Sequence, residues 1–303
     1  MIAVDLGSNT FRAVEMACDT LEPAAEYEKI VRTADGLVET GKISDAAVER
    51  IVAAAREAKE RLDFSQGVRA VTTEAIRRAA NASEVLARIH ERTGLRFETI
   101  SGEEEARYTL LAVRTRLEKL SRESRRFLMV DIGGGSTEIA FFHEGRIATR
   151  SFPVGIVTLA QGYGTLEAIE AALPSLTAPM ASYVEQMRAE GFRPRLFVPT
   201  AGTPTTVAAM KLGMTYATYD ARRVNGTTLT PEELQRQFER LMSLDEAART
   251  ELVGVGREDL IAAGILIFRQ LFAVTGFLEA TVVDDGLREG VAIAACREMN
   301  GKQ

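Results

Sequence analysis

Two stretches of the chain share one order of apolar and polar positions. In each, an apolar run ends at an aspartate, a glycine-containing turn follows, and a second apolar run comes after the turn. The first stretch covers residues 1–18 and has the turn Asp5-Leu-Gly-Ser-Asn-Thr10. The second covers residues 127–142 and continues from its aspartate as Asp131-Ile-Gly-Gly-Gly-Ser-Thr-Glu138. The recurrence predicts two β-hairpins related by an internal duplication.

After each hairpin the spacing of apolar residues becomes that of helices and single strands. Residues 44–62 carry apolar side chains three and four positions apart, with Ser44 as the N-cap. Further strands are expected at 24–33, 67–72, 95–100, 146–152, 195–198 and 280–283. Further helices are expected at 83–92, 101–120, 156–161, 165–190 with a break near Pro174 or Pro179, 207 onward, 230–242, 257–272 and from 284–290 onward. Both halves follow the order βββαβαβα, a mixed α/β layer structure.

A polar and charged segment, residues 119–126, separates the two halves. Its composition predicts a connector. We expect domains at 1–122 and 123–287, with the C-terminal helix, 288–303, packing back on the first domain. A length of 303 residues is sufficient for two domains of ordinary size.

Composition and charge exclude several classes of protein. The sequence is 46% hydrophobic and 26% charged, and no apolar run approaches the roughly 20 residues of a membrane span. The start of the chain lacks the pattern of a signal peptide, so a cytoplasmic location is expected. A net charge of −6 argues against general nucleic-acid binding, although arginines can still gather at one site.

The few cysteines and histidines narrow the chemistry. Cys18 and Cys296 lie far apart in sequence, which predicts neither a zinc site nor a disulfide but two small core residues. The only histidines are His90 and His143, so a histidine metal centre or a catalytic triad is not expected. Acid–base chemistry must then fall to carboxylates.

The consecutive glycines at 133–135 are the first candidate site. Successive glycines cost backbone entropy, and a close approach of main-chain N–H groups to a phosphate would justify them. The carboxylates of Asp131 and Glu138 could hold Mg²⁺, which prefers oxygen ligands. Each turn leads into a strand rather than a helix, unlike Rossmann and Walker loops. The alternative is an ordinary glycine-rich hairpin turn.

The helix start at 101–107 is the second candidate. Ser101 and Glu104 have the spacing of a capping box, and Glu103 suits the first turn of a helix. Glu105 is then left as a candidate functional carboxylate. The alternative is that all three glutamates merely decorate the helix start.

The segment Pro199-Thr-Ala-Gly-Thr-Pro-Thr-Thr206 is the third candidate. A strand runs into it and a helix leaves it, so a helix N-terminus could face an anion. The alternative is a plain N-cap formed by Thr203 or Thr205.

Together the motifs resemble those of one family. They are Asp5-Leu-Gly-Ser-Asn-Thr10, Thr73-Glu-Ala-Ile-Arg-Arg-Ala-Ala-Asn81, Ser101-Gly-Glu-Glu-Glu-Ala-Arg107, Asp131-Ile-Gly-Gly-Gly-Ser-Thr-Glu138, and Arg257-Glu-Asp-Leu-Ile with Gly286-Leu-Arg-Glu-Gly290. The two halves look like the actin/Hsp70/sugar kinase superfold. Within it the chain resembles the exopolyphosphatase/guanosine pentaphosphate phosphohydrolase (Ppx/GppA) phosphatase family. The resemblance implies two actin-like (ribonuclease H-like) domains that face each other across a central cleft.

The resemblance also implies roles for residues of this sequence. Glu105 would be the general base, and Asp131, Glu138 and Asp5 would bind Mg²⁺, with a monovalent cation as an optional second ion. The residues implied in substrate binding are Gly7, Ser8, Asn9, Thr10, Arg12, Arg77, Gly133, Gly134, Gly135, Ser136, Gly202, Thr203 and Arg257. For the three arginines the alternative is a surface salt bridge.

The implied reaction is release of terminal orthophosphate from inorganic polyphosphate. Short chains are expected to be favoured, because this sequence does not include the C-terminal helical domains that help many family members hold long polymers. The first alternative is a guanosine pentaphosphate (pppGpp) 5′-phosphohydrolase of the stringent response. Further alternatives are a sugar or acyl kinase and a non-catalytic nucleotide sensor. The expected assembly is a homodimer.

Overall fold

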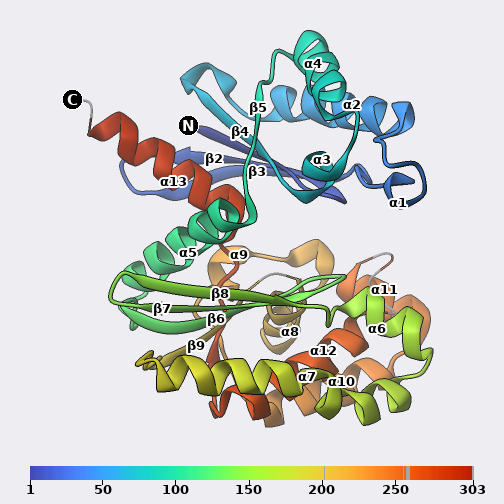
Figure 1. The fold of residues 1–303 in the computed structure, drawn as a ribbon, viewed down its shortest axis with the longest axis vertical. Coiled ribbons are helices and arrows are strands. Elements are labelled where there is room, and N and C mark those ends of the chain that lie inside the picture. Colours follow the sequence, from blue (N-terminus) through green and yellow to red (C-terminus); the bar gives the residue numbers. More distant parts are fainter. Residues whose placement is uncertain (201, 255, 257–259, 302–303) are drawn as a thin grey trace. The chain divides into compact units, whose positions relative to one another are not determined.

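The computed structural model describes residues 1–200, 202–254, 256 and 260–301. By its internal contacts the chain divides into two compact units, Met1–Val113 with Gly286–Gln303 (unit 1) and Arg114–Asp285 (unit 2). Each unit combines β-strands with helices (Figure 1). The division lies within helix α5 (Gly102–Lys119), before the polar segment 119–126 that was expected to connect the two domains. Among the described helices, none is both long and apolar enough to cross a membrane.

Unit 1 is built on a five-stranded sheet of order β3-β2-β1-β4-β5. Neighbours among the first three strands are antiparallel, while β4 runs parallel to β1 and β5 parallel to β4. The strands are β1 (Ile2–Leu6), β2 (Thr10–Ala17), β3 (Glu22–Ile30), β4 (Val68–Thr72) and β5 (Phe97–Thr99). The helices are α1 (Leu37–Thr40), α2 (Asp45–Arg61), α3 (Glu74–Arg78), α4 (Ala82–Thr93), the first part of α5, and α13 (Leu287–Asn300).

Helices cover both faces of the unit 1 sheet (Figure 1). Side chains alternate along a strand, so Val4 packs with α2 and α4, whereas Ala3 packs with α5 and α13. Gly290 of α13 lies against α5, and a Cβ at this position would stand 1.9 Å from the carbonyl oxygen of Tyr108. This close approach gives a physical reason for the last glycine of the 286–290 motif.

Unit 2 contains a four-stranded sheet of order β8-β7-β6-β9. The first three strands along the chain are antiparallel neighbours, and β9 runs parallel to β6. The strands are β6 (Arg126–Ile132), β7 (Thr137–His143), β8 (Arg146–Phe152) and β9 (Leu196–Thr200). The helices are α6 (Ile156–Tyr163), α7 (Leu166–Ala189), α8 (Gly202–Lys211), α9 (Ala221–Val224), α10 (Pro231–Ser243), α11 (Glu246–Val253) and α12 (Ile261–Thr275).

One helix of unit 2 is longer than expected. The predicted break near Pro174 or Pro179 is wrong, because α7 runs through both prolines as a single helix. Proline removes a backbone donor and disfavours a helix interior. However, α7 buries an apolar face, including Leu173 and Met180, in the unit 2 core and packs along α12. Tertiary packing therefore outweighs the local cost of the prolines.

The last predicted strand, 280–283, is only partly formed. β11 (Ala280–Thr281) pairs antiparallel with β10 (Thr228–Leu229) in a separate two-stranded sheet. Val283 then donates its N–H to the carbonyl of Pro199 at 3.3 Å. The chain thus continues beside β9 without forming a regular ladder with it.

Both cysteines lie in an apolar cluster of unit 1, as expected, but the expectation that they form no disulfide is wrong. Cys18 and Cys296 form a disulfide bond, with Cα atoms 5.1 Å apart and 278 positions between them in sequence. Cys18 directly follows β2, Cys296 lies on α13, and α13 packs against β2. The pairing therefore arises from the docking of the C-terminal helix on unit 1, which the spacing of the cysteines did not indicate.

Candidate active site

The two predicted hairpins fold alike at their turns. Gly7 donates its N–H to the carbonyl of Thr10 at 3.0 Å, and Gly133 donates to the carbonyl of Ser136 at 2.8 Å. In both hairpins the aspartate occupies the second-last position of the strand that enters the turn. The backbone of both turns thus supports the predicted duplication.

The start of α6 holds the carbonyl groups of the second turn, residues 133–136. Ile156 donates its N–H to Gly133 at 3.0 Å, while Val157 and Thr158 donate to Gly134 at 2.8 and 3.2 Å. The first N–H groups of a helix have no partner within it, so the turn supplies what α6 requires. In return, the carbonyls of the turn are directed toward the helix.

The first turn, residues 7–10, is held in the same way by the segment after β3. Val31 and Arg32 donate their N–H groups to the carbonyl of Asn9 at 2.8 and 2.9 Å, and Ala34 donates to Ser8 at 2.8 Å. In both units, therefore, the segment that follows the third strand of the sheet supports the turn from behind.

This support leaves N–H groups on the open side of both turns. Across a trans peptide the N–H points opposite to the preceding carbonyl, so the bonded carbonyls direct the N–H groups of Asn9, Gly134 and Gly135 away from their supports. Within the described part of the chain these N–H groups donate to no protein atom. All three residues are exposed. Main-chain donors in such a turn suit phosphate oxygens.

Gly155 is a site residue that the sequence analysis missed. It precedes α6 and packs directly on the second turn, where a Cβ would lie 2.4–2.5 Å from backbone atoms of Gly134, Gly135 and Ser136. A larger residue fits only if the turn moves. The available signal was a glycine soon after the third strand of the hairpin unit.

The residue opposite the aspartate differs between the two hairpins. The register pairs Asp131 with Glu138 across β6 and β7, and directly paired residues share one face of a sheet. The register of β1 and β2 instead pairs Asp5 with Arg12. The second hairpin thus presents two carboxylates, and the first presents a carboxylate and a guanidinium.

Two hydroxyl groups hold Glu138 in place. Its Oε1 accepts hydrogen bonds from Ser136 and Ser151, both at 2.6 Å. Ser151 lies on β8 directly across from Glu138, and the sequence analysis did not identify it. Hydrogen bonds of this kind commonly orient a carboxylate that binds a metal.

The Asp131–Glu138 pair fits a Mg²⁺ ion that binds together with phosphate. Mg²⁺ is usually held by one or two carboxylates, with waters and substrate phosphates as further ligands. The described residues contain no group of three or more His, Cys, Asp or Glu side chains suited to enclosing a metal. The donors therefore do not form a closed metal cage. Metal binding by this pair, and by Asp5, stays a prediction.

Asp5 is a buried carboxylate in the first hairpin. It is only 7% exposed, and its Oδ1 has no hydrogen-bond partner among the described residues. Burial raises the pKa of Asp5 to about 6, although Arg12 and Arg288 attract the ionised form. Arg12 itself lies 3.3 Å from Glu28, with both side chains over 40% exposed. Arg12 therefore forms a surface ion pair with Glu28, and its guanidinium could also bind an anion.

The motif at 286–290 forms the start of α13. Glu289 is buried and accepts a hydrogen bond from the N–H of Gly286 at 2.8 Å, which caps the helix. Arg288 pairs with both Glu289 and Glu26. These charges act on Asp5, so the C-terminal helix shapes the electrostatics of the first hairpin.

The three glutamates at the start of α5 have different roles, as predicted. Ser101 and Glu104 form the capping box, with the Ser101 N–H 2.8 Å from Glu104 Oε2 and the Glu104 N–H 3.2 Å from Ser101 Oγ. Glu103 pairs at the surface with Arg107 at 2.8 Å. Helix formation therefore accounts for Glu103 and Glu104 but not for Glu105.

Arg77 lies beside Glu105. Arg77 Nη1 donates to the carbonyl of Ile100 at 2.6 Å and stands 3.8 Å from Glu105 Oε2. The guanidinium of α3 is thus fixed at the start of α5, where it can orient the carboxylate. A contact between Arg77 and substrate stays a prediction.

In the third candidate segment, residues 199–206, the side chain of Thr203 packs against a neighbouring helix. α8 begins at Gly202, so Thr203 and Thr205 lie inside the helix and the N-cap alternative is wrong. Thr203 is only 1% exposed, and a Cβ on Gly264 of α12 would stand 2.2 Å from its Oγ1. The side chain of Thr203 is therefore packed against α12 and is not exposed for contact with substrate. Arg257 lies outside the described residues.

Comparison with known proteins agrees with these observations. The model of the Ppx/GppA phosphatase family matches residues 12–298. Exopolyphosphatase 2 of Mycobacterium tuberculosis is 27% identical over 96% of this chain and 97% of that protein. A guanosine-5′-triphosphate,3′-diphosphate pyrophosphatase of Photobacterium profundum is 29% identical over 98% of this chain, which spans 59% of that longer protein. The Aquifex aeolicus member of the Ppx/GppA family has a TM-score of 0.77 at 29% identity, covering 99% of this chain and 98% of its own, and so confirms the predicted fold class.

Proposed function

Because the chain belongs to the Ppx/GppA phosphatase family, as predicted, we propose that it hydrolyses the terminal phosphoanhydride of inorganic polyphosphate and releases orthophosphate. The observation that carries this proposal is the pair of like turns with outward N–H groups, together with the carboxylate pair on the second hairpin. A relative that aligns over nearly its full length is named an exopolyphosphatase, which supports the same reaction.

The two turns would bind phosphate groups of the substrate. Phosphoryl transfer depends mainly on positioning and on neutralising the charge of the phosphates. The N–H groups of Asn9, Gly134 and Gly135 would donate to phosphate oxygens, and Arg12 would add a charged donor on the first hairpin. Mg²⁺ held by Asp131 and Glu138 would supply further charge neutralisation.

Glu105 is the proposed general base. It would accept a proton from the water that attacks the terminal phosphorus, while the bond from that phosphorus to the bridging oxygen breaks. Glu104 caps α5 and Glu103 forms a surface pair, whereas the carboxylate of Glu105 lies 3.8 Å from Arg77. Arg77 would orient the carboxylate toward the water.

Guanosine pentaphosphate is the second candidate substrate. Its 5′ end carries the same terminal phosphoanhydride, so the same turns and base would serve. The name of the Photobacterium profundum relative favours this alternative. The preference for short polyphosphate, the homodimer and a second cation stay predictions.

Phosphate release from purified protein tests the proposal. With Mg²⁺ present, we expect release from tripolyphosphate, long polyphosphate or guanosine pentaphosphate in preference to ATP. Glu105→Gln should lower turnover at least about 10²-fold, the usual effect of a general base. Glu103→Gln, two residues before Glu105 and paired at the surface with Arg107, is the matched control and should retain turnover.

Two results would contradict the proposal. Wild-type protein that releases no phosphate from the three phosphate substrates would leave the kinase and sensor alternatives standing. Equal turnover of Glu105→Gln and Glu103→Gln would remove Glu105 from the chemistry.

A further inference from the structure

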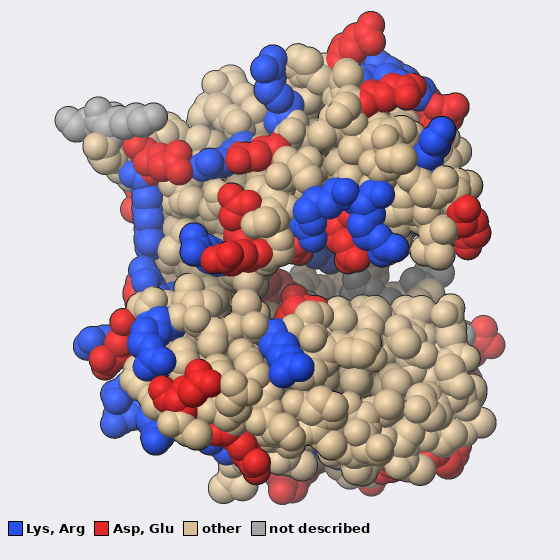
Figure 2. All heavy atoms as spheres, viewed as in Figure 1, with Lys and Arg blue, Asp and Glu red and all other residues tan. Residues whose placement is uncertain are grey.

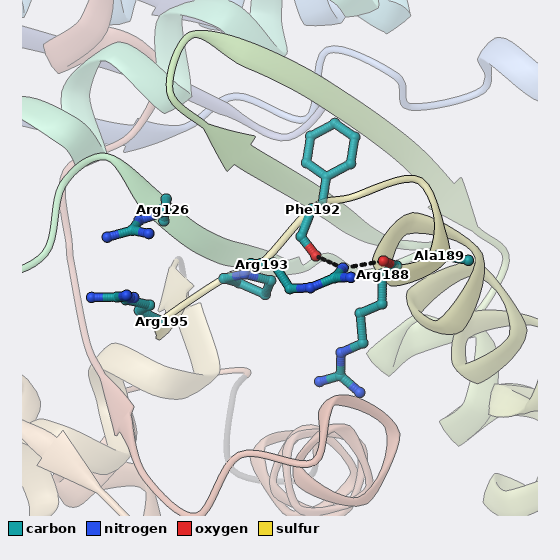
Figure 3. A pocket seen from close by; sticks show the side chains of 7 residues that line it. Arg126, Arg188, Ala189, Phe192, Arg193 and Arg195 are labelled. Carbon is teal, nitrogen blue, oxygen red and sulfur yellow. Dashed lines mark hydrogen bonds between the residues drawn. The ribbon is translucent and has the colours of Figure 1, made fainter.

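Unit 2 has an arginine-lined hollow at the end of its sheet opposite to the second turn. The hollow has a volume of about 670 Å³ and is lined by Arg126, Arg188, Arg193 and Arg195 with Phe192 and Pro194 (Figure 3). Arg126 begins β6, and five residues along a strand place it about 17 Å from Asp131. The hollow is therefore separate from the second turn. We name it the arginine hollow.

The fold brings Arg126 and Arg195 together. β6 and β9 are parallel neighbours, and the N–H of Arg195 donates to the carbonyl of Arg126 at 2.8 Å. Figure 3 shows both guanidinium groups pointing to the same side of the strands. Two like charges held next to each other repel, and an anion between them would relieve that repulsion.

The other two arginines are fixed by backbone carbonyls rather than by carboxylates. Arg193 donates to the carbonyls of Arg188 and Phe192 (Figure 3). Arg188 donates to the carbonyl of Thr275. Arg188 lies in the last turn of α7 and Thr275 ends α12, so these carbonyls carry the partial negative charge of helix C-termini, which offsets only part of the guanidinium charge. The guanidinium of Arg193 therefore adds positive charge to the arginine hollow, whereas that of Arg188 points away from Arg126 and Arg195 (Figure 3).

The positive charge of the hollow is poorly balanced. Within the described residues, the one carboxylate within 4.0 Å of its four guanidinium groups is that of Glu123, 3.7 Å from Arg126. The side chain of Arg195 has no hydrogen bond or ion pair there, and the buried Nε–H of Arg126 donates to no atom. This excess stands out in a chain whose net charge is −6.

Charged side chains are unevenly distributed on the surface of unit 2. Figure 2 shows most of the charged side chains of unit 2, Lys and Arg with Asp and Glu among them, toward the edge where, in Figure 1, α7 ends and β9 begins. Much of the remaining face of unit 2 in this view is uncharged. Clustered arginines produce a local potential that attracts anions even on an acidic protein.

We propose that the arginine hollow binds an inorganic oligophosphate at a second site. Guanidinium groups match phosphate oxygens with paired N–H donors, and several of them suit several consecutive phosphates. The ring of Phe192 is buried and covered by Arg146 at 4.4 Å, so the hollow offers no exposed ring for a nucleobase. The choice of oligophosphate as the anion rests on the proposed function, whereas the excess of positive charge does not.

Calorimetric titration with tripolyphosphate in EDTA tests this site without turnover. We expect two binding events in wild-type protein and the loss of one, or at least about a tenfold weaker affinity for it, in Arg126→Gln/Arg195→Gln. The control is Arg222→Gln, which removes an exposed arginine of α9 in the same unit and should bind as wild type does. Arg126→Lys/Arg195→Lys keeps the charge and should retain part of the binding.

Tripolyphosphate hydrolysis with Mg²⁺ separates this site from the proposed active site. The double Gln variant should keep the wild-type kcat on tripolyphosphate, and its melting temperature shows whether it is folded. Unchanged stoichiometry and affinity in the folded double variant would overturn the proposal. Stronger binding of GTP than of tripolyphosphate at the hollow would overturn the assignment of an inorganic anion. If wild-type protein hydrolyses nothing, the proposed function fails while the titration still tests the hollow.

Discussion

The first and second hairpins share a turn but differ in charge. Both turns close with the same hydrogen bond and are supported by the segment after the third strand. Opposite the aspartate, however, the first hairpin carries Arg12 and the second carries Glu138. A duplicated backbone thus presents N–H donors twice, while one side-chain position decides whether a hairpin adds a cation or a second carboxylate.

This difference indicates a division of roles. A carboxylate pair suits a hard metal ion that bridges to phosphate, whereas a guanidinium contacts phosphate directly. The two hairpins would therefore neutralise substrate charge by different means. Substitutions in each hairpin should therefore have different effects on turnover, stability and substrate binding.

The largest effect is expected at the carboxylate pair of the second hairpin. Asp131→Asn should lower turnover by about 10³-fold, because metal-assisted charge stabilisation contributes several kcal/mol to the transition state. Steady-state phosphate release at saturating Mg²⁺ measures it. Glu144→Gln, in the β7–β8 turn of the same unit, is the matched control. Wild-type turnover in Asp131→Asn would mean that the pair holds no essential metal.

The buried aspartate of the first hairpin should make stability depend on pH. Burial raises the folded-state pKa of Asp5 from 3.8 to about 6, so the folded protein binds more protons than the unfolded chain between these values. Its contribution to the free energy of unfolding falls as pH rises through this window. Asp5→Asn should therefore gain up to about 3 kcal/mol at pH 8 and almost nothing at pH 4.

Urea unfolding of Asp5→Asn and wild type across this range provides the measurement. Asp19→Asn, an exposed aspartate of unit 1, is the control. A stability difference that grows toward low pH would contradict a raised pKa of Asp5 in the folded protein.

The support of the second turn by α6 can be broken selectively. Gly155→Ala places a methyl group within 2.5 Å of the backbone of the second turn. Overpacking of this kind costs about 2 kcal/mol, and displacement of the turn should also raise the KM for tripolyphosphate. Chemical unfolding and steady-state kinetics measure the two effects. Gly162→Ala, which meets no atom within 4 Å in the same helix, should not destabilise the protein. Equal behaviour of the two variants would mean that the turn adapts.

The smallest effect is expected at the cation of the first hairpin. Arg12→Gln should raise the KM for tripolyphosphate by about tenfold with little change in kcat, because Arg12 would bind substrate and transition state alike. Arg12→Lys should recover part of the loss. A fall in kcat without a change in KM would instead place Arg12 in the chemical step.

Local features of the fold and site could be predicted from the sequence. The hairpins, the order of elements and the capping box of Ser101 with Glu104 depend on residues close together in the chain. The same local pattern assigned Glu104 to the helix cap and Glu103 to the exposed first turn, which left Glu105 as the candidate, and the structure agrees on the first two residues.

Features that depend on distant contacts could not be predicted. The continuity of α7 through Pro174 depends on its packing, and the Cys18–Cys296 bond depends on where α13 docks. In the site, Ser151 acts through strand register and Gly155 through a close backbone approach. The spacing of apolar residues along the chain indicates neither the register of Ser151 nor the close backbone approach of Gly155.

The dependence of tripolyphosphate hydrolysis on Mg²⁺ concentration tests the division of roles most directly. Glu138→Gln removes one carboxylate of the second hairpin, and Arg12→Gln removes the cation at the equivalent position of the first. We expect the half-saturating Mg²⁺ concentration to rise at least about tenfold in Glu138→Gln, because a metal ligand is lost, and to stay at the wild-type value in Arg12→Gln. An unchanged Mg²⁺ requirement in Glu138→Gln, or an equal rise in both variants, would contradict this division of roles.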